Sequence, residues 1–274
     1  MALQRAVVSP PVPTLDVAIS LNQPASSVVR GGPFLFFSGL CAVDPETGQR
    51  VHGTTATETR LILGNLQRML EAAGSSMQEV VKVNVLLHSM LEAVPMNDVY
   101  MKFFPDPPPA RTVCGARLPD GCKVIIECTA LALVMTGKLS RSAIFPKNPA
   151  IHIARTANLP NVPGIRAGDY IFVSGMGPID PVTGERNHGA IAHQVRITLE
   201  NMKHLLESSG SSLARIVRVH VVLADLADVD AMEQVYREFF PIDPPARTVW
   251  SMQLRFGNGC EIECLALAGG DPAI

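Results

Sequence analysis

The sequence lacks the features that mark nucleic-acid-binding and membrane proteins. It contains no cluster of Lys and Arg, a single Trp, and a formal net charge of −2 with a pI near 6.4. Proteins that bind nucleic acid need a basic patch for the phosphates, so we expect no nucleic-acid partner. The N-terminal segment has no sustained apolar run and is interrupted by Pro10, Pro11, Pro13 and Asp16, which predicts neither a signal peptide nor a membrane span. We therefore expect a cytoplasmic protein without a membrane partner.

Spacings of cysteine and histidine that suit a metal are also missing. Six cysteines are present, no Cys-x-x-Cys pair occurs, and the seven histidines have no partner at ligand spacing. The sequence thus specifies neither a zinc site nor a disulfide framework, and we expect no metal and buried, reduced thiols. Charged residues make up only 18% of the chain and hydrophobic residues 47%, a balance typical of a globular protein with much buried surface.

The sequence does contain an internal repeat. Pro-Pro-Ala-Arg-Thr-Val occurs at 108–113 and again at 244–249, which places the two arginines at an offset of 247 − 111 = 136. One offset that holds without gaps indicates a tandem duplication. We predict two domains, at 14–135 and 149–270, joined by a linker at 136–148. The same offset aligns Phe37-Ser38-Gly39 with Val173-Ser174-Gly175, and Glu127-Cys128 with Glu263-Cys264.

Each copy predicts the same order of elements. A strand that ends in Ser-Gly precedes a helix with apolar residues at helical spacing, an alternating strand, a second helix, the arginine strand and a returning strand. In the first copy we expect the first strand at 33–39 and the first helix at 54–73. The alternating strand is expected at 81–87 and the returning strand at 122–133. Turn residues at Asp120-Gly121 and Gly257-Asn258-Gly259 predict that the last two strands form a hairpin. We expect an α+β fold with a mixed sheet and both helices on one face, and the uncovered face predicts a homo-oligomer.

The arginine of each copy is a candidate for binding a carboxylate. Arg111 and Arg247 each follow Pro-Pro-Ala, where fixed φ angles hold the backbone, and a guanidinium offers a planar fork that matches a carboxylate. The alternative is a structural ion pair. No local carboxylate partner is evident in the sequence of either copy, which favours the binding role.

A second candidate is Glu261, whose equivalent in the first copy is Ile125. A carboxylate that isoleucine replaces in the other copy is not required by the fold, so we interpret Glu261 as functional, with a solvated strand glutamate as the alternative. Glu263 faces the same way on a strand, so two carboxylates could line one surface. In a hairpin, Arg247 would lie opposite a residue near 268, roughly 20 Å along the strand from Glu261. We therefore expect the arginine of one domain to meet the glutamate of its neighbour.

These motifs, in this order, resemble the reactive intermediate deaminase family, also called Rid or YjgF/RidA. The resemblance rests on the Ser-Gly strand end, Asp-Pro-x-Thr-Gly, Tyr-x-x-Phe-Phe-Pro, Pro-Ala-Arg-Thr-Val and Glu-Ile-Glu-Cys-Leu-Ala, and it covers both copies nearly end to end. It implies a chorismate-mutase-like fold and trimers, here with six Rid-like domains. A tyrosine common early in such domains is replaced by Ala25 and Asn161.

The resemblance also implies roles for individual residues. Family members hydrolyse 2-enamino and 2-imino acids to 2-keto acids and ammonia without a cofactor. The carboxylate-binding arginine corresponds to Arg247 and, by position, to Arg111, and the water-positioning glutamate corresponds to Glu261. Further substrate-binding positions are Ser174 and Gly175, Ser38 and Gly39, and Asn97 with its equivalent Glu233.

Three functions are compatible with these motifs. The first is a deaminase that acts on a small substrate bearing a carboxylate, with Arg247 and Glu261 as catalytic residues. The second is a ligand-binding or regulatory protein without turnover. The third is a pathway enzyme that uses the same cleft for tautomerisation, cyclisation or hydrolysis of a carbonyl or imine, because a fold does not fix its chemistry.

Overall fold

The structure, a computed structural model, describes residues 5–9, 13–15, 24–104, 106–133, 139–151 and 159–269. It divides into two compact units, one of Met1–Pro109 with Ala116–Arg141 and the other of Ala110–Gly115 with Ser142–Ile274. The domain boundaries proposed from the repeat stay a prediction, and residues 136–138 of the proposed linker and residue 270 lie outside the described residues. Within that linker the chain forms a strand, β7 (Arg141–Ile144).

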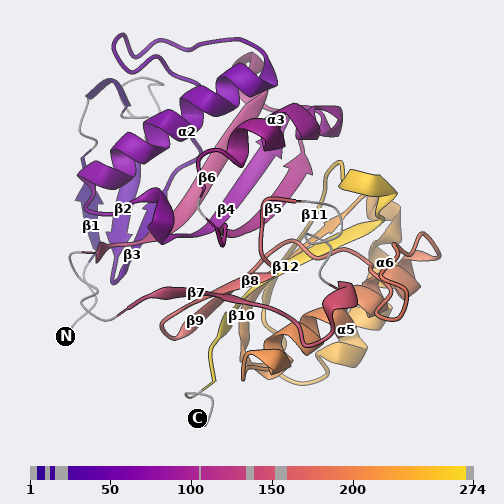
Figure 1. Ribbon diagram of the computed structural model, residues 1–274. Coiled ribbons are helices and arrows are strands. Elements are labelled where there is room, and N and C mark those ends of the chain that lie inside the picture. Colours follow the sequence, from indigo (N-terminus) through magenta and orange to yellow (C-terminus); the bar gives the residue numbers. More distant parts are fainter. Residues whose placement is uncertain are drawn as a thin grey trace. The chain divides into compact units, whose positions relative to one another are not determined.

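The first sheet has the order β1-β2-β3-β6-β4-β5. The helices α2 (Thr55–Ala72) and α3 (Ala93–Tyr100) lie together on one of its faces (Figure 1). Proline and glycine-rich segments form short 3₁₀ turns such as η4 (Pro119–Gly121). The strands are β1 (Arg5–Val8), β2 (Val28–Gly31), β3 (Phe34–Phe37), β4 (Val80–Leu87), β5 (Ala110–Gly115) and β6 (Val124–Leu131).

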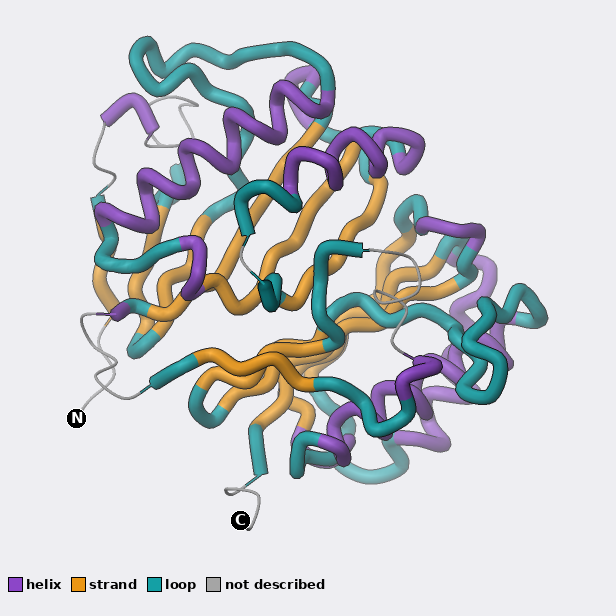
Figure 2. Tube along the Cα trace, viewed as in Figure 1, coloured by secondary structure: helices purple, strands orange, loops and turns teal. Residues whose placement is uncertain are grey.

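The second sheet repeats this arrangement in the order β11-β10-β12-β9-β8-β7. Its helices, α5 (Ile191–Ser208) and α6 (Val229–Phe239), also lie on one face (Figure 2). The remaining strands are β8 (Gly164–Ala167), β9 (Tyr170–Val173), β10 (Ile216–Leu223), β11 (Ala246–Ser251) and β12 (Cys260–Leu267), and η9 (Arg255–Gly257) precedes β12. The predicted α+β fold, a mixed sheet with two helices in each half, is confirmed.

The core of the second unit follows from the alternation seen in the sequence. Val219, Val221 and Leu223 of β10 are fully buried and pack in one cluster with apolar residues of α5, such as Leu199 and Leu206. Side chains of a strand alternate between its two faces, so His220 and Val222, which lie between these residues, belong to the opposite face. All six cysteines of the chain are buried, as expected.

The predicted hairpin between the last two strands is wrong. β10 lies between β11 and β12, parallel to the first and antiparallel to the second, and Val219 of β10 is opposite both Arg247 and Cys264. The end of β10 holds both neighbours: Met252 N donates to Leu223 O at 3.1 Å and Ala224 N donates to Gly259 O at 2.8 Å. The glycine turn therefore carries the chain across the end of β10. At ~3.3 Å per residue and ~4.8 Å between strands, the Cα atoms of Arg247 and Glu261 lie roughly 14 Å apart.

No helix of the described residues is both long and apolar enough to cross a membrane.

Candidate active site

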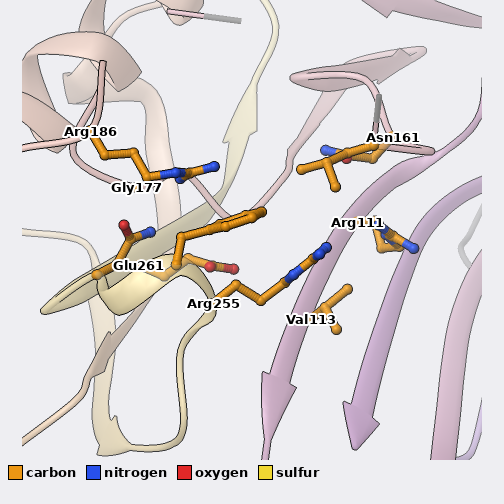
Figure 3. Close-up of a pocket in the computed structure, with 11 residues that line it drawn as sticks. Arg111, Val113, Asn161, Gly177, Arg186, Arg255 and Glu261 are labelled. Atoms are coloured by element: carbon orange, nitrogen blue, oxygen red, sulfur yellow. The ribbon is translucent and has the colours of Figure 1, made fainter. Parts of the chain in front are cut away.

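A pocket in the second unit brings together the arginine of the first sequence copy and the glutamate of the second. Arg111, on β5, and Glu261, on β12, both line it (Figure 3). The pocket opens to solvent, and its empty space together with the open part is about 460 Å³. The other lining residues are Val113, Leu159, Asn161, Gly175, Gly177, Arg186, Arg255, Phe256 and Asn258.

Two glycines after β9 make room for the side chains of the pocket. A Cβ on Gly175 would lie 2.0 Å from Glu261 Oε1, and one on Gly177 would lie 2.4 Å from Asn258 Nδ2. Any larger residue would displace these groups. Only glycine at these two positions leaves room for the carboxylate of Glu261 and the amide of Asn258 where they lie. In the first unit, Gly39 leaves room for Ile125 in the same way, because a Cβ added to Gly39 would lie 2.9 Å from Ile125 Cγ2.

Ser174 holds the arginine strand in place. It is buried, its hydroxyl accepts from Arg111 N at 2.8 Å and donates to Val162 O at 2.5 Å, and Gly175 N donates to Arg111 O at 3.1 Å. Ser174 is not a lining residue, so its contribution is to position the backbone of Arg111. In the first unit, Ser38 Oγ donates to Ser26 O at 2.8 Å.

The expectation that Arg247 has no local carboxylate partner is wrong. Both terminal nitrogens of its guanidinium donate to Glu233 of α6, Nη1 to Oε2 at 3.3 Å and Nη2 to Oε1, and its Cζ lies 4.3 Å from the centroid of the Tyr236 ring. One turn of α6 separates Glu233 from Tyr236, so both reach the same guanidinium. The equivalent of Glu233 is Asn97, a buried residue of α3, and an amide brings no negative charge.

Glu263 does not share the pocket with Glu261. It is buried, it accepts a hydrogen bond from Thr112 Oγ1, and its Oε1 lies 2.8 Å from His220 Nδ1. These contacts give Glu263 a structural role beside the arginine strand. Of the predicted site residues, the structure gathers Arg111, Gly175 and Glu261 at the pocket and leaves Arg247 and Glu233 outside it.

Comparison with known proteins extends the resemblance seen in the sequence. The chain is 41% identical over 110 residues to a RutC family protein of Pyrococcus horikoshii, which covers 40% of this chain and 86% of that protein. It is 41% identical over 88 residues to the 3-aminoacrylate deaminase RutC of Acinetobacter baylyi, covering 32% and 70%. Reactive Intermediate Deaminase A of Arabidopsis thaliana, a chloroplastic protein, is 35% identical over 108 residues, covering 39% and 58%.

The family model described as Endoribonuclease L-PSP matches the chain twice, at residues 16–132 and 153–268. The chain belongs to this family, that of the Rid (RidA/YjgF) proteins. A solved structure of a Rid relative, described as a putative endoribonuclease of Thermotoga maritima, is 37% identical with a TM-score of 0.42 and covers 47% of this chain and 97% of that one.

The lining residues of this Rid protein that sequence reasoning missed include Arg186, Arg255 and Phe256. Burial, followed by the nearby charge of Arg255, lowers the pKa of Arg186 to about 10 even though Glu261 opposes the shift. Burial also lowers the pKa of Arg255. With Arg111, three arginines and one glutamate line the pocket, a formal charge of +2. Comparison of the copies would have singled out two of them, because Arg255 and Phe256 correspond to Pro119 and Asp120.

Proposed function

We propose that this Rid protein is a cofactor-free hydrolytic deaminase that converts 2-imino or 2-enamino acids into 2-keto acids and ammonia. The observation that carries the proposal is the presence of Arg111 and Glu261 in one pocket. A guanidinium fork binds a carboxylate with two parallel hydrogen bonds, and a glutamate within reach of the neighbouring carbon can take a proton from water. Relatives named as deaminases of a 3-aminoacrylate and of reactive intermediates support the reaction class.

In the proposed mechanism each group has one task. Arg111 binds the substrate carboxylate and so fixes C2 of the protonated imine in the pocket. Glu261 removes a proton from a water molecule, whose oxygen bonds to C2 while the electron pair of the C=N bond moves to nitrogen. Glu261 passes that proton to the nitrogen of the resulting amino alcohol. The C–N bond then breaks while the hydroxyl gives its own proton to Glu261, which forms the ketone and releases ammonia, and Glu261 finally loses this proton to solvent. The net reaction consumes one water per imine, and the four other charged or amide side chains of the pocket orient the acid.

The substitution Glu261→Gln tests the role of Glu261 as general base, because glutamine keeps the shape of the side chain and removes its basicity. We expect kcat for ammonia release from freshly generated 2-iminopropanoate to fall by ~10² to 10⁴, while the affinity for pyruvate, the product, changes little. Glu127→Gln is the matched control, because Glu127 is an exposed glutamate of β6 that accepts from Asn84 Nδ2 at 2.6 Å. Full turnover by Glu261→Gln would exclude this role. Binding of pyruvate without turnover in the parent protein would favour the regulatory alternative.

The location and the assembly of the protein are part of the same proposal. We propose a cytoplasmic protein and, on the resemblance to the Rid family, an assembly of three chains.

A further inference from the structure

We propose that the substrate of this pocket carries a second carboxylate, which Arg186 and Arg255 bind. The proposal rests on the proposed function for the binding of the first carboxylate by Arg111. It adds a specificity: a 2-imino acid with a second acidic group should be preferred over the acid of the same length that ends in a methyl group.

Phe256 brings the two guanidinium groups together. Arg186 Cζ lies 3.5 Å from the centroid of the Phe256 ring and Arg255 Cζ lies 4.5 Å from it, so the two Cζ atoms are at most 8 Å apart, the sum of these distances. Guanidinium groups that stack on a ring keep the N–H groups at their edges available for hydrogen bonds. In Figure 3, Arg186 and Arg255 enter the same pocket, and Arg255 extends toward Val113 and Arg111.

The charges around these arginines favour binding of an anion in the pocket that they line. Each is about half buried, and Arg255 lowers the pKa of Arg186, which shows mutual repulsion. Glu261 is the negative group that opposes this repulsion on both, and one carboxylate leaves the pocket with a charge of +2. A substrate with a single carboxylate reduces that to +1, whereas a dicarboxylate neutralises it. Opposite charges that come together in a partly buried pocket attract more strongly than in water.

The first copy shows that the fold does not require the two neighbouring arginines, Arg186 and Arg255. Arg50, the equivalent of Arg186, lies 3.5 Å from Asp120 Oδ2 and donates to Cys122 Sγ at 2.8 Å. The second copy has Phe256 in place of Asp120 and Arg255 in place of Pro119. The first copy therefore has one arginine with one carboxylate at this place, whereas the second has two arginines and one carboxylate, Glu261.

The backbone at Phe256 gives independent support. Phe256 has φ 63° and ψ 16°, the left-handed conformation, and Asp120 has φ 52° in the same place. Asp is among the residues that tolerate this conformation, whereas a bulky aromatic residue is rarely found in it. A Phe kept at such a position indicates a use for its ring, and the ring contacts the two arginines.

A matched pair of product analogues tests the second carboxylate. 2-Oxoglutarate and 2-oxopentanoate have the same chain length and differ only in a terminal carboxylate or methyl group. By calorimetry at low salt we expect the parent protein to bind 2-oxoglutarate at least about 10-fold more tightly. Arg255→Met and Arg186→Met, which keep an apolar stem over Phe256, should each reduce this preference to less than about 3-fold. Arg237→Met is the control for net charge, because Arg237 is an exposed residue of α6, and it should keep the preference. Thermal melts check that each variant folds.

The outcomes separate this proposal from the reaction. Equal affinities for the two acids, a preference that survives both arginine variants, or no binding of either acid at millimolar concentration would each overturn it. If the preference is found and no imine is hydrolysed, the second carboxylate site stands and the deaminase proposal fails. If imines are hydrolysed without any preference between the two acids, the deaminase proposal stands and the second carboxylate site fails.

Discussion

At the scale of residues, equivalent positions of the two copies have acquired different environments. Arg247 is held by Glu233 and stacks on Tyr236, whereas Arg111 lines the pocket and has Asn97 at the position equivalent to Glu233. A guanidinium already bound by a carboxylate of its own chain has little to offer a second one. The exchange of Asn for Glu therefore gives Arg247 a carboxylate of α6 that is absent from the equivalent position beside Arg111.

This difference predicts unequal effects of the same substitution. Arg111→Lys keeps the charge and loses the bidentate fork, so it should weaken pyruvate binding by ~1 to 3 kcal/mol. Arg247→Lys should leave that affinity nearly unchanged and should instead lower thermal stability, because it disturbs a partly buried pair. Calorimetry and melting curves of both variants measure the contrast. Weaker binding in Arg247→Lys than in Arg111→Lys would reverse the assignment.

Cys260 predicts how stability depends on pH. Burial raises the pKa of its thiol from 9.0 to about 12, so above pH ~9 the unfolded chain loses a proton that the native chain keeps. The unfolded state then binds fewer protons, and the free energy of unfolding should fall by about 1.4 kcal/mol per pH unit for this one thiol. Other groups titrate in the same range, so urea unfolding of the parent is compared with that of Cys260→Ala between pH 8 and pH 10.5. Parallel pH dependences would contradict the prediction.

At the scale of elements, the sequence predicted the repeating strands and helices well but the connection of the last two strands poorly. Val217, Val219 and Val221 alternate with Arg218 and His220, and this pattern by itself predicts a strand with one buried face. Gly257 marks a turn, but a turn signal does not say which strand the chain joins next. The sheet places β10 between β11 and β12, a long-range pairing that local residues do not encode.

Because local residues do not encode long-range contacts, the sequence identified some residues of the pocket and missed others. Glu261 stood out because isoleucine replaces it in the other copy. Arg255 and Phe256 differ between the copies just as sharply, but they lie in a segment interpreted only as a turn. The ion pair of Arg247 with Glu233 joins a strand to a helix 14 residues earlier, a contact that only the packing of α6 on the sheet brings about.

The first long helices of the two halves provide a matched test of capping. Thr54 caps α2, where its hydroxyl accepts from Thr57 N at 3.2 Å, whereas its equivalent Ala190 offers α5 no side-chain cap. Thr54→Ala should therefore lower the free energy of unfolding by ~0.5 to 2 kcal/mol, and Ala190→Thr should raise it by a smaller amount. Urea unfolding measures both. A stabilising effect of Thr54→Ala would show that the cap contributes nothing.

At the scale of the whole molecule, the outer strand of the second sheet indicates association. β11 ends its sheet and exposes Ala246, Thr248 and Ser251, whereas β5, its equivalent, is buried along its whole length. An exposed edge strand invites contact with another chain, and a contact between unlike surfaces forms a ring where its rotation closes.

We predict a ring of three chains. Light scattering should give a mass near 88 kDa, three times the 29.4 kDa of one chain, at micromolar concentration. Thr248→Lys, on the exposed edge, should shift the protein toward smaller species by placing a charge in the contact, while Thr183→Lys in an exposed turn should not. A stable mass of about 29 kDa for the parent protein would contradict the ring.

The ungapped duplication has a genetic consequence. In a protein assembled from identical single-domain chains, one codon sets a given position in every site, so a change that improves one site alters all of them. Here codons 125 and 261 encode equivalent positions separately, and one of them has come to specify isoleucine while the other specifies glutamate. Selection can thus change the residues of one copy, or remove their function, without changing the equivalent residues of the other copy.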